Sequence, residues 1–206
     1  MEQNSAAEHL QVIRTLMERS AIYRRTLAPI MSFVGTIGVL ASLGGIVFKV
    51  ETMRLFCGWW LVTALMAVAG AFLIARRQAL KDSEPFWSPP TRRVTQALLP
   101  ALTAGLLFSI VLMIFNPGQL RWLFIFPNAT FYGCAVHAAG FFMPRGMKLF
   151  GWAIIVLAGL TLPVIPMFET DPNPRLDHAL MGFFFGGLHL VYGGYLYLTE
   201  KRKSVT

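Results

Sequence analysis

Long apolar segments alternate with short polar ones along most of this chain. Six apolar segments of about 20 residues contain no Asp, Glu, Lys or Arg: 29–48, 55–75, 94–115, 122–143, 149–168 and 178–199. Because an α-helix rises about 1.5 Å per residue, each can cross a hydrocarbon layer of about 30 Å. Within lipid a helix satisfies its own backbone hydrogen bonds. The pattern therefore predicts an all-α fold, an integral membrane bundle of six transmembrane helices arranged as three helical hairpins.

The segment before the first span has a different pattern. Leu10, Ile13 and Met17 recur at intervals of three and four residues, while Arg14 and Glu18 fall on the other side. This spacing predicts an amphipathic helix within residues 1–28, on the cytoplasmic side. Its apolar stripe either lies in the lipid headgroup layer or packs against protein, and both interpretations stay open. If it packs against a partner, Leu10, Ile13 and Met17 are the candidate partner-binding residues.

Composition limits the number of domains. The chain has 206 residues, of which 55% are hydrophobic and 14% charged. Once six spans are subtracted, too few residues remain for a second folded unit. We therefore expect a single membrane domain over residues 1–206.

The charge distribution predicts the orientation. Of the 18 Lys and Arg residues, fourteen lie before the first span, between spans two and three, between spans four and five, or after span six. The other four are Lys49, Arg54, Arg121 and Arg175. Cytoplasmic loops carry the excess of basic residues, so both termini are expected in the cytoplasm, with the protein in a bacterial-type cytoplasmic (inner) membrane. The basic residues are spread over short border segments, which excludes the grouped basic face of a nucleic-acid-binding protein.

Small residues recur at every third or fourth position in the first three spans. The three faces are Gly38, Ser42 and Gly45; Thr63, Ala67, Ala71 and Ala75; and Ala97, Ala101, Gly105 and Ser109. Small faces let helices approach closely in lipid. We therefore expect tight contact among spans one, two and three.

Histidine is the only residue type inside the predicted spans that is readily protonated near pH 7. His137 and His189 lie at similar depth in spans four and six, which both run from outside to inside. That placement suits bis-histidine ligation of haem b, and nearby glycines leave room for a macrocycle. The plainer interpretation is that these histidines make hydrogen bonds between helices. No cofactor is therefore expected, and a haem-binding redox protein is the alternative.

Polar residues near the outer end suggest two further sites. Glu169, Asp171, Asp177 and His178 could form a cation site, but their spacing fits no known loop, so a solvated acidic loop is the preferred interpretation and no metal site is predicted. A carried molecule would contact the most polar surfaces of spans four and six. These candidate ligand-binding residues are Thr130, Cys134, His137, His178 and His189.

No catalytic motif accompanies these features. The sequence has no Gly-rich phosphate loop, paired-cysteine motif, nucleophile elbow or metalloprotease motif, so a non-enzymatic role is favoured. We expect a multi-pass membrane protein that is a small membrane subunit or a carrier for an uncharged or hydrophobic molecule. Its expected partners are the lipid bilayer and either another membrane protein or a second copy of the chain.

Overall fold

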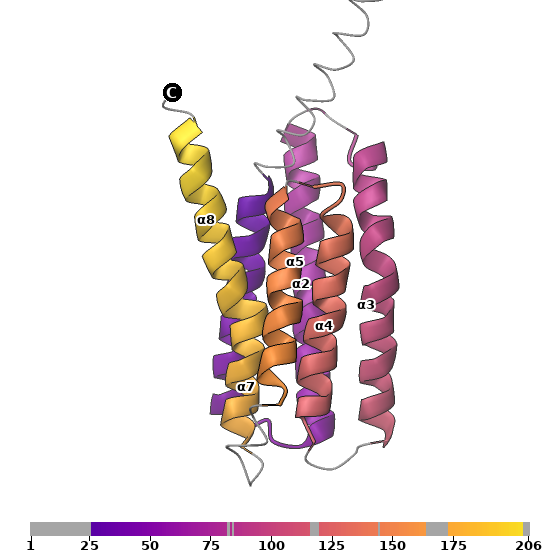
Figure 1. The fold of residues 1–206 in the computed structure, drawn as a ribbon, viewed down its shortest axis with the longest axis vertical. Helices are drawn as coiled ribbons and strands as arrows, with labels where there is room; N and C mark the ends of the chain where they lie inside the picture. The colour runs from indigo at the N-terminus through magenta and orange to yellow at the C-terminus, as the bar shows by residue number, and fades with distance from the viewer. Residues whose placement is uncertain are drawn as a thin grey trace, which may run out of the picture.

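Every regular element that the structure describes is a helix. The computed structural model describes residues 26–81, 83, 85–115, 120–143, 145–163 and 173–203. The helices are Thr26–Val47, α2 (Met53–Lys81), α3 (Pro89–Phe115), α4 (Trp122–Ala139), α5 (Arg145–Thr161), and a final helix formed by α7 (Pro174–Gly182), the π-helical η1 (Phe183–Gly187) and α8 (Leu188–Lys203). Figure 1 shows them side by side along one long axis. The prediction of an all-α bundle is confirmed for this part of the chain.

Four helices have the length and apolar composition needed to cross a membrane. They are Thr26–Val47, Met53–Lys81, Pro89–Phe115 and Pro174–Thr199, and the apolar helix Gly146–Thr161 is shorter. Large apolar side chains point outward around the bundle; Val62 is 58% exposed and Val191 is 74% exposed. In water such a surface would be unfavourable, whereas in lipid it is solvated. The chain is therefore a helical membrane protein.

Several helix ends differ from the predicted ones. α2 extends beyond residue 75 to Lys81, because basic residues are tolerated once a helix leaves the hydrocarbon layer. α3 begins at Pro89, since proline fits the first turn of a helix, where its missing N–H is not needed. α4 ends at Ala139 instead of residue 143. The chain turns there through hydrogen bonds from Phe141 N and Phe142 N to carbonyls three residues back.

The helices form a ring in which each helix contacts the next one along the chain. Trp59 of α2 donates its indole N–H to the Ala41 carbonyl of the first helix. Ser109 of α3 donates to Asn128 of α4. A Cβ on Gly133 of α4 would lie 2.7 Å from the Ile155 side chain of α5.

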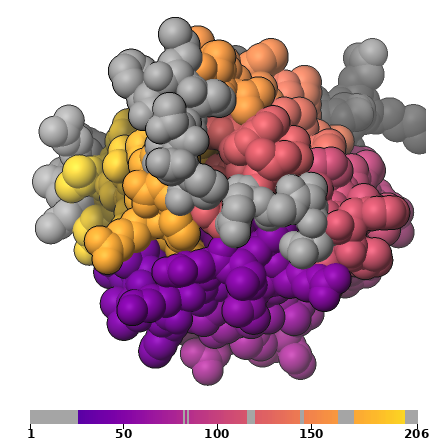
Figure 2. All heavy atoms as spheres, turned by 90° about the horizontal axis from the view of Figure 1, so that it is seen from below, coloured from indigo at the N-terminus to yellow at the C-terminus, as the bar shows by residue number. Residues whose placement is uncertain are grey.

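Glycines on the first and last helices close this ring. A Cβ on Gly35 would lie 2.7 Å from the Leu190 side chain, and one on Gly186 would lie 2.7 Å from the Val39 amide nitrogen. A Cβ on Gly38 would clash with the Phe185 backbone. Figure 2, which views the bundle from the end where α7 begins, shows the first and last helices in contact along one side.

These contacts correct the prediction that small faces join the first three spans. The face of the first helix, with Gly38, Ser42 and Gly45, packs on α7 and η1. Gly105 and Ser109 of α3 face α4. A stripe of small residues lets any helix approach closely, including one distant in sequence. It therefore does not specify which helix packs against it.

Aromatic side chains fill the centre of the bundle, between the helices. Phe56 of α2 meets Phe124 of α4 edge-on at 5.7 Å, and Phe126 of α4 meets Phe184 of η1 edge-on at 6.3 Å. All four side chains are at most 2% exposed. This core holds α2, α4 and η1 together and lies between two buried polar clusters.

Candidate functional site

Two local backbone features build the first polar cluster, at the end of the bundle where α4 and α7 begin. Asn173 caps α7 by accepting hydrogen bonds from Arg175 N and Leu176 N, with Pro174 at the first helical position. The first helix ends in a turn closed by hydrogen bonds from Val50 N to Gly45 O and from Lys49 N to Ile46 O. Lys49 adopts a positive φ of 52° there, as in a Schellman motif.

Arg121 and Asp177 form a buried ion pair in this first cluster. The Arg121 Nε donates to the Asp177 carboxylate, and its Nη1 donates to the Glu51 carbonyl oxygen at 2.7 Å. Arg121 is 1% exposed and Asp177 is 8% exposed. The pair ties the start of α4 to the start of α7 and to the loop that follows the first helix.

This pairing corrects the expectation of a solvated acidic loop at Asp177. Because α7 begins at Pro174, Asp177 lies in the first helical turn and faces the protein interior instead of water. Burial without Arg121 would be costly, and the ion pair offsets that cost. Glu169 and Asp171 lie outside the described residues.

His178 is the centre of the same cluster. Its Nε2 lies 3.0 Å from the Val50 carbonyl oxygen, and its Nδ1 accepts a hydrogen bond of 3.2 Å from Trp60 Nε1. A carbonyl only accepts and an indole N–H only donates, so these partners assign the neutral tautomer with the proton on Nε2. Ser42 Oγ donates to the His178 carbonyl oxygen at 2.8 Å. Both ring nitrogens therefore serve to join helices.

The second polar cluster lies between α4, α5 and α8. The Tyr132 hydroxyl and His189 Nε2 are 2.6 Å apart, and His189 is fully buried. Phe150 of α5 meets the His189 ring edge-on at 5.0 Å and stacks on Tyr192 at 4.7 Å. The π-helical turn just before His189 shifts its position on the helix, because Leu188 N bonds to Phe183 O, five residues back.

Two polar atoms in this second cluster are buried without a hydrogen bond in the described part of the chain. They are His189 Nδ1 and the Tyr192 hydroxyl. The Phe184 carbonyl interacts with the His189 ring, but Nδ1 makes no hydrogen bond of good geometry. The Tyr192 hydroxyl lies against Gly146, where an added Cβ would be 2.6 Å away.

The other candidate ligand-binding residues lie elsewhere on α4. His137 Nδ1 donates to the Lys148 carbonyl oxygen at 3.3 Å, and its ring meets Phe141 and Trp152 edge-on. Thr130 Oγ1 donates to a carbonyl of its own helix, and Cys134 is exposed. Within the described part of the chain, Thr130, Cys134 and His137 make no hydrogen bond or ring contact with Tyr132, Phe150 or His189.

The contacts of His137 and His189 bear on the haem alternative. The two rings contact different neighbours. His137 contacts Lys148, Phe141 and Trp152. His189 contacts Tyr132 and Phe150. His189 would have to give up its contact with Tyr132 to ligate iron through Nε2. Haem binding stays a prediction, as does the carrier site. Across the described residues, no three His, Cys, Asp or Glu side chains gather in a group that could hold a metal ion.

Reasoning from the sequence missed Arg121, Tyr132 and Trp60 as members of these clusters. One signal was available, since Arg121 and Asp177 carry opposite charges and both immediately precede apolar segments on the same predicted side. Tyr132 and Trp60 carry no such signal, because aromatic residues are common throughout membrane helices. Leu10, Ile13 and Met17 lie outside the described residues.

The fold is that of a helical membrane protein with two buried polar clusters, and in the first of them His178 has both ring nitrogens bonded to protein groups. Comparison of the chain with models of protein families, with curated proteins and with solved structures found no match.

Proposed function

We propose that the chain is a non-enzymatic subunit of a bacterial-type cytoplasmic membrane, with six spans and both termini in the cytoplasm. In this role the bundle is a rigid support that binds another membrane protein or a second copy of itself.

Helix lengths support six spans. α4 has 18 residues and α5 has 17, which correspond to about 27 Å and about 26 Å, close to a hydrocarbon thickness of about 30 Å. Both lie alongside the longer helices in Figure 1. A short helix spans by local thinning of the bilayer at modest cost.

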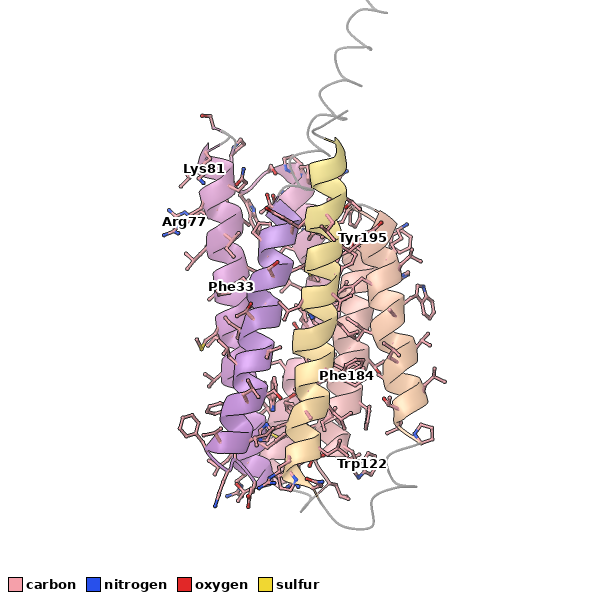
Figure 3. The ribbon with its side chains drawn as sticks, turned by 90° about the vertical axis from the view of Figure 1, so that its left-hand side faces the viewer. Phe33, Arg77, Lys81, Trp122, Phe184 and Tyr195 are labelled. Carbon is pink, nitrogen blue, oxygen red and sulfur yellow. The ribbon has the colours of Figure 1, made fainter. Side chains whose placement is uncertain are left out.

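Charge placement supports the orientation. Figure 3 shows Arg77 and Lys81 at one end of the bundle and Trp122 at the opposite end. Arg92 and Arg93 at the start of α3 belong to the same end as Lys81, because α2 and α3 are joined there. This basic end is the one expected in the cytoplasm.

The observation that carries the functional proposal is how the interior polar groups are bonded. Both nitrogens of His178 are occupied by protein groups, Arg121 is paired with Asp177, and Ser109 is bonded to Asn128. Such bonds hold helices in fixed positions. A carrier would instead gather its polar groups around a shared path, whereas Thr130 and His178 have separate partners and Cys134 is an exposed free thiol.

A pull-down with matched variants tests the subunit role. The full tagged chain is extracted from its native membrane in mild detergent, and its complex is resolved by native electrophoresis and mass spectrometry. We expect one stoichiometric membrane protein, or a second copy of this chain, that is lost when Leu10, Ile13 and Met17 are changed to Glu. Changing Arg14 and Glu18 to Gln on the opposite face is the control and should retain it. A bare monomer in all three samples would overturn the proposal.

A further inference from the structure

The α4–α5 pair is shorter than the helices around it. α2 and α3 have 29 and 27 residues, against 18 for α4 and 17 for α5. Figure 1 shows that the connection between α4 and α5 stops short of the ends of α2, α3 and α8. This end of the pair therefore stops before the ends of its longer neighbours.

Exposed apolar side chains and one lysine lie at this end of the α4–α5 pair. Phe141 is 62% exposed, Phe142 49%, Leu149 71% and Trp152 52%. The Lys148 Nζ lies 3.8 Å from the centroid of the Phe141 ring, a cation–π contact. We call these five residues the tip surface.

His137 fixes the shape of the tip surface. Its ring meets Phe141 at 5.4 Å and Trp152 at 5.4 Å, both edge-on, and its Nδ1 is bonded to the Lys148 carbonyl. The His137 bond fixes the Lys148 backbone, and the cation–π contact holds the Lys148 ammonium over the Phe141 ring, so less side-chain freedom is lost when Lys148 binds an anion.

The described side chains that carry charge at this end of the bundle are all positive. Arg92 and Arg93 are exposed at the start of α3, which packs beside α4. The carboxylates whose side chains the structure describes are Glu51 and Asp177, and both belong to the opposite end of the bundle. A cation at the border of a low-dielectric layer gains most from a nearby anion.

We propose that the tip surface binds an anionic phospholipid of the inner leaflet. Lys148 contacts the phosphate, Arg92 and Arg93 add attraction, and the acyl chains lie on Phe142, Leu149 and Trp152. This inference rests on the proposed orientation, which places the tip surface at the cytoplasmic border.

Native mass spectrometry of the purified full chain in detergent tests this site. The protein is titrated with phosphatidylglycerol, with phosphatidylcholine of the same acyl chains, or with inorganic phosphate. One basic residue near a membrane surface is worth about 1 kcal/mol, so Lys148→Gln should weaken phosphatidylglycerol binding about five-fold. Arg54→Gln, which removes an exposed charge at the opposite end, is the matched control and should change nothing.

Each outcome decides for or against the site. Preference for phosphatidylglycerol that is lost in Lys148→Gln and kept in Arg54→Gln supports it. Equal binding of both lipids, or unchanged binding in Lys148→Gln, overturns it. Binding of inorganic phosphate as tight as that of the lipid overturns the assignment to a phospholipid. The measurement is made in detergent and needs no partner protein, so it fails independently of the subunit proposal.

Discussion

Two tyrosines of the second polar cluster offer a prediction in which the same substitution, Tyr to Phe, has opposite effects at the two positions. The Tyr132 hydroxyl is bonded to His189 at 2.6 Å, whereas the Tyr192 hydroxyl is buried without a hydrogen bond in the described chain. Tyr132→Phe removes a hydroxyl that has a partner and leaves His189 Nε2 without it. Tyr192→Phe removes a hydroxyl that has no hydrogen-bond partner among the described residues. It keeps the ring stacked on Phe150, with the centroids 4.7 Å apart and an interplanar angle of 12°.

The expected magnitudes follow from hydrogen bonding inside membrane proteins. Interhelical hydrogen bonds measured there average about 0.6 kcal/mol and reach about 1.7 kcal/mol. Because His189 is fully buried, we expect Tyr132→Phe to cost about 1–2 kcal/mol. Tyr192→Phe should stabilise the fold by about 1 kcal/mol, since it removes the desolvation cost of an unpaired hydroxyl.

Unfolding in mixed micelles, followed by helix content as the denaturing detergent increases, measures both variants. Tyr197→Phe, on an exposed ring of α8, is the control and should stay close to the wild type. If Tyr192→Phe is destabilising to the same extent as Tyr132→Phe, the assignment of bonded and unbonded hydroxyls is wrong.

Further predictions concern glycines and the buried ion pair. Gly38→Ala should destabilise the bundle by about 1–3 kcal/mol in the same unfolding assay, because its Cβ would meet the Phe185 backbone. Gly194→Ala is the control: a Cβ there would have nothing within 4 Å, so this variant should be neutral or stabilising by up to about 1 kcal/mol. Arg121→Met should cost about 3–5 kcal/mol by leaving the Asp177 carboxylate buried alone, and adding Asp177→Leu should recover most of that loss. A double variant no more stable than Arg121→Met would contradict the ion-pair argument.

Much of the fold could be predicted from the sequence because lipid imposes a simple rule on it. A long uncharged segment must be helical in a bilayer, and this rule located the helices that the structure describes. It does not fix helix ends, which depend on local chemistry. Because Asn173 caps the last helix and Pro174 fits its first position, this helix begins at residue 174 and not at the expected residue 178. Asp177, expected in a loop, therefore lies in the helix.

The polar clusters were harder to predict, because their members are distant in sequence. Arg121 and Asp177 are 56 residues apart, and His178 and Val50 are 128 apart. These residues can pair only if their helices become neighbours in the bundle, and faces of small residues alone do not specify which helices are neighbours. The histidines stood out in the sequence as polar residues of the spans, whereas their aromatic partners Trp60 and Tyr132 gave no distinguishing pattern.

The side of the membrane on which Phe142 lies tests the six-span account most directly. Phe142→Cys is introduced together with Cys57→Ala and Cys134→Ala, and intact cells are treated with a membrane-impermeant maleimide. Thr52→Cys in the same background is the control for the outer side. The account predicts that Thr52→Cys reacts in intact cells, while Phe142→Cys, 49% exposed at the end of α4, reacts only after permeabilisation. Reaction of Phe142→Cys in intact cells would show that α4 and α5 do not cross the membrane.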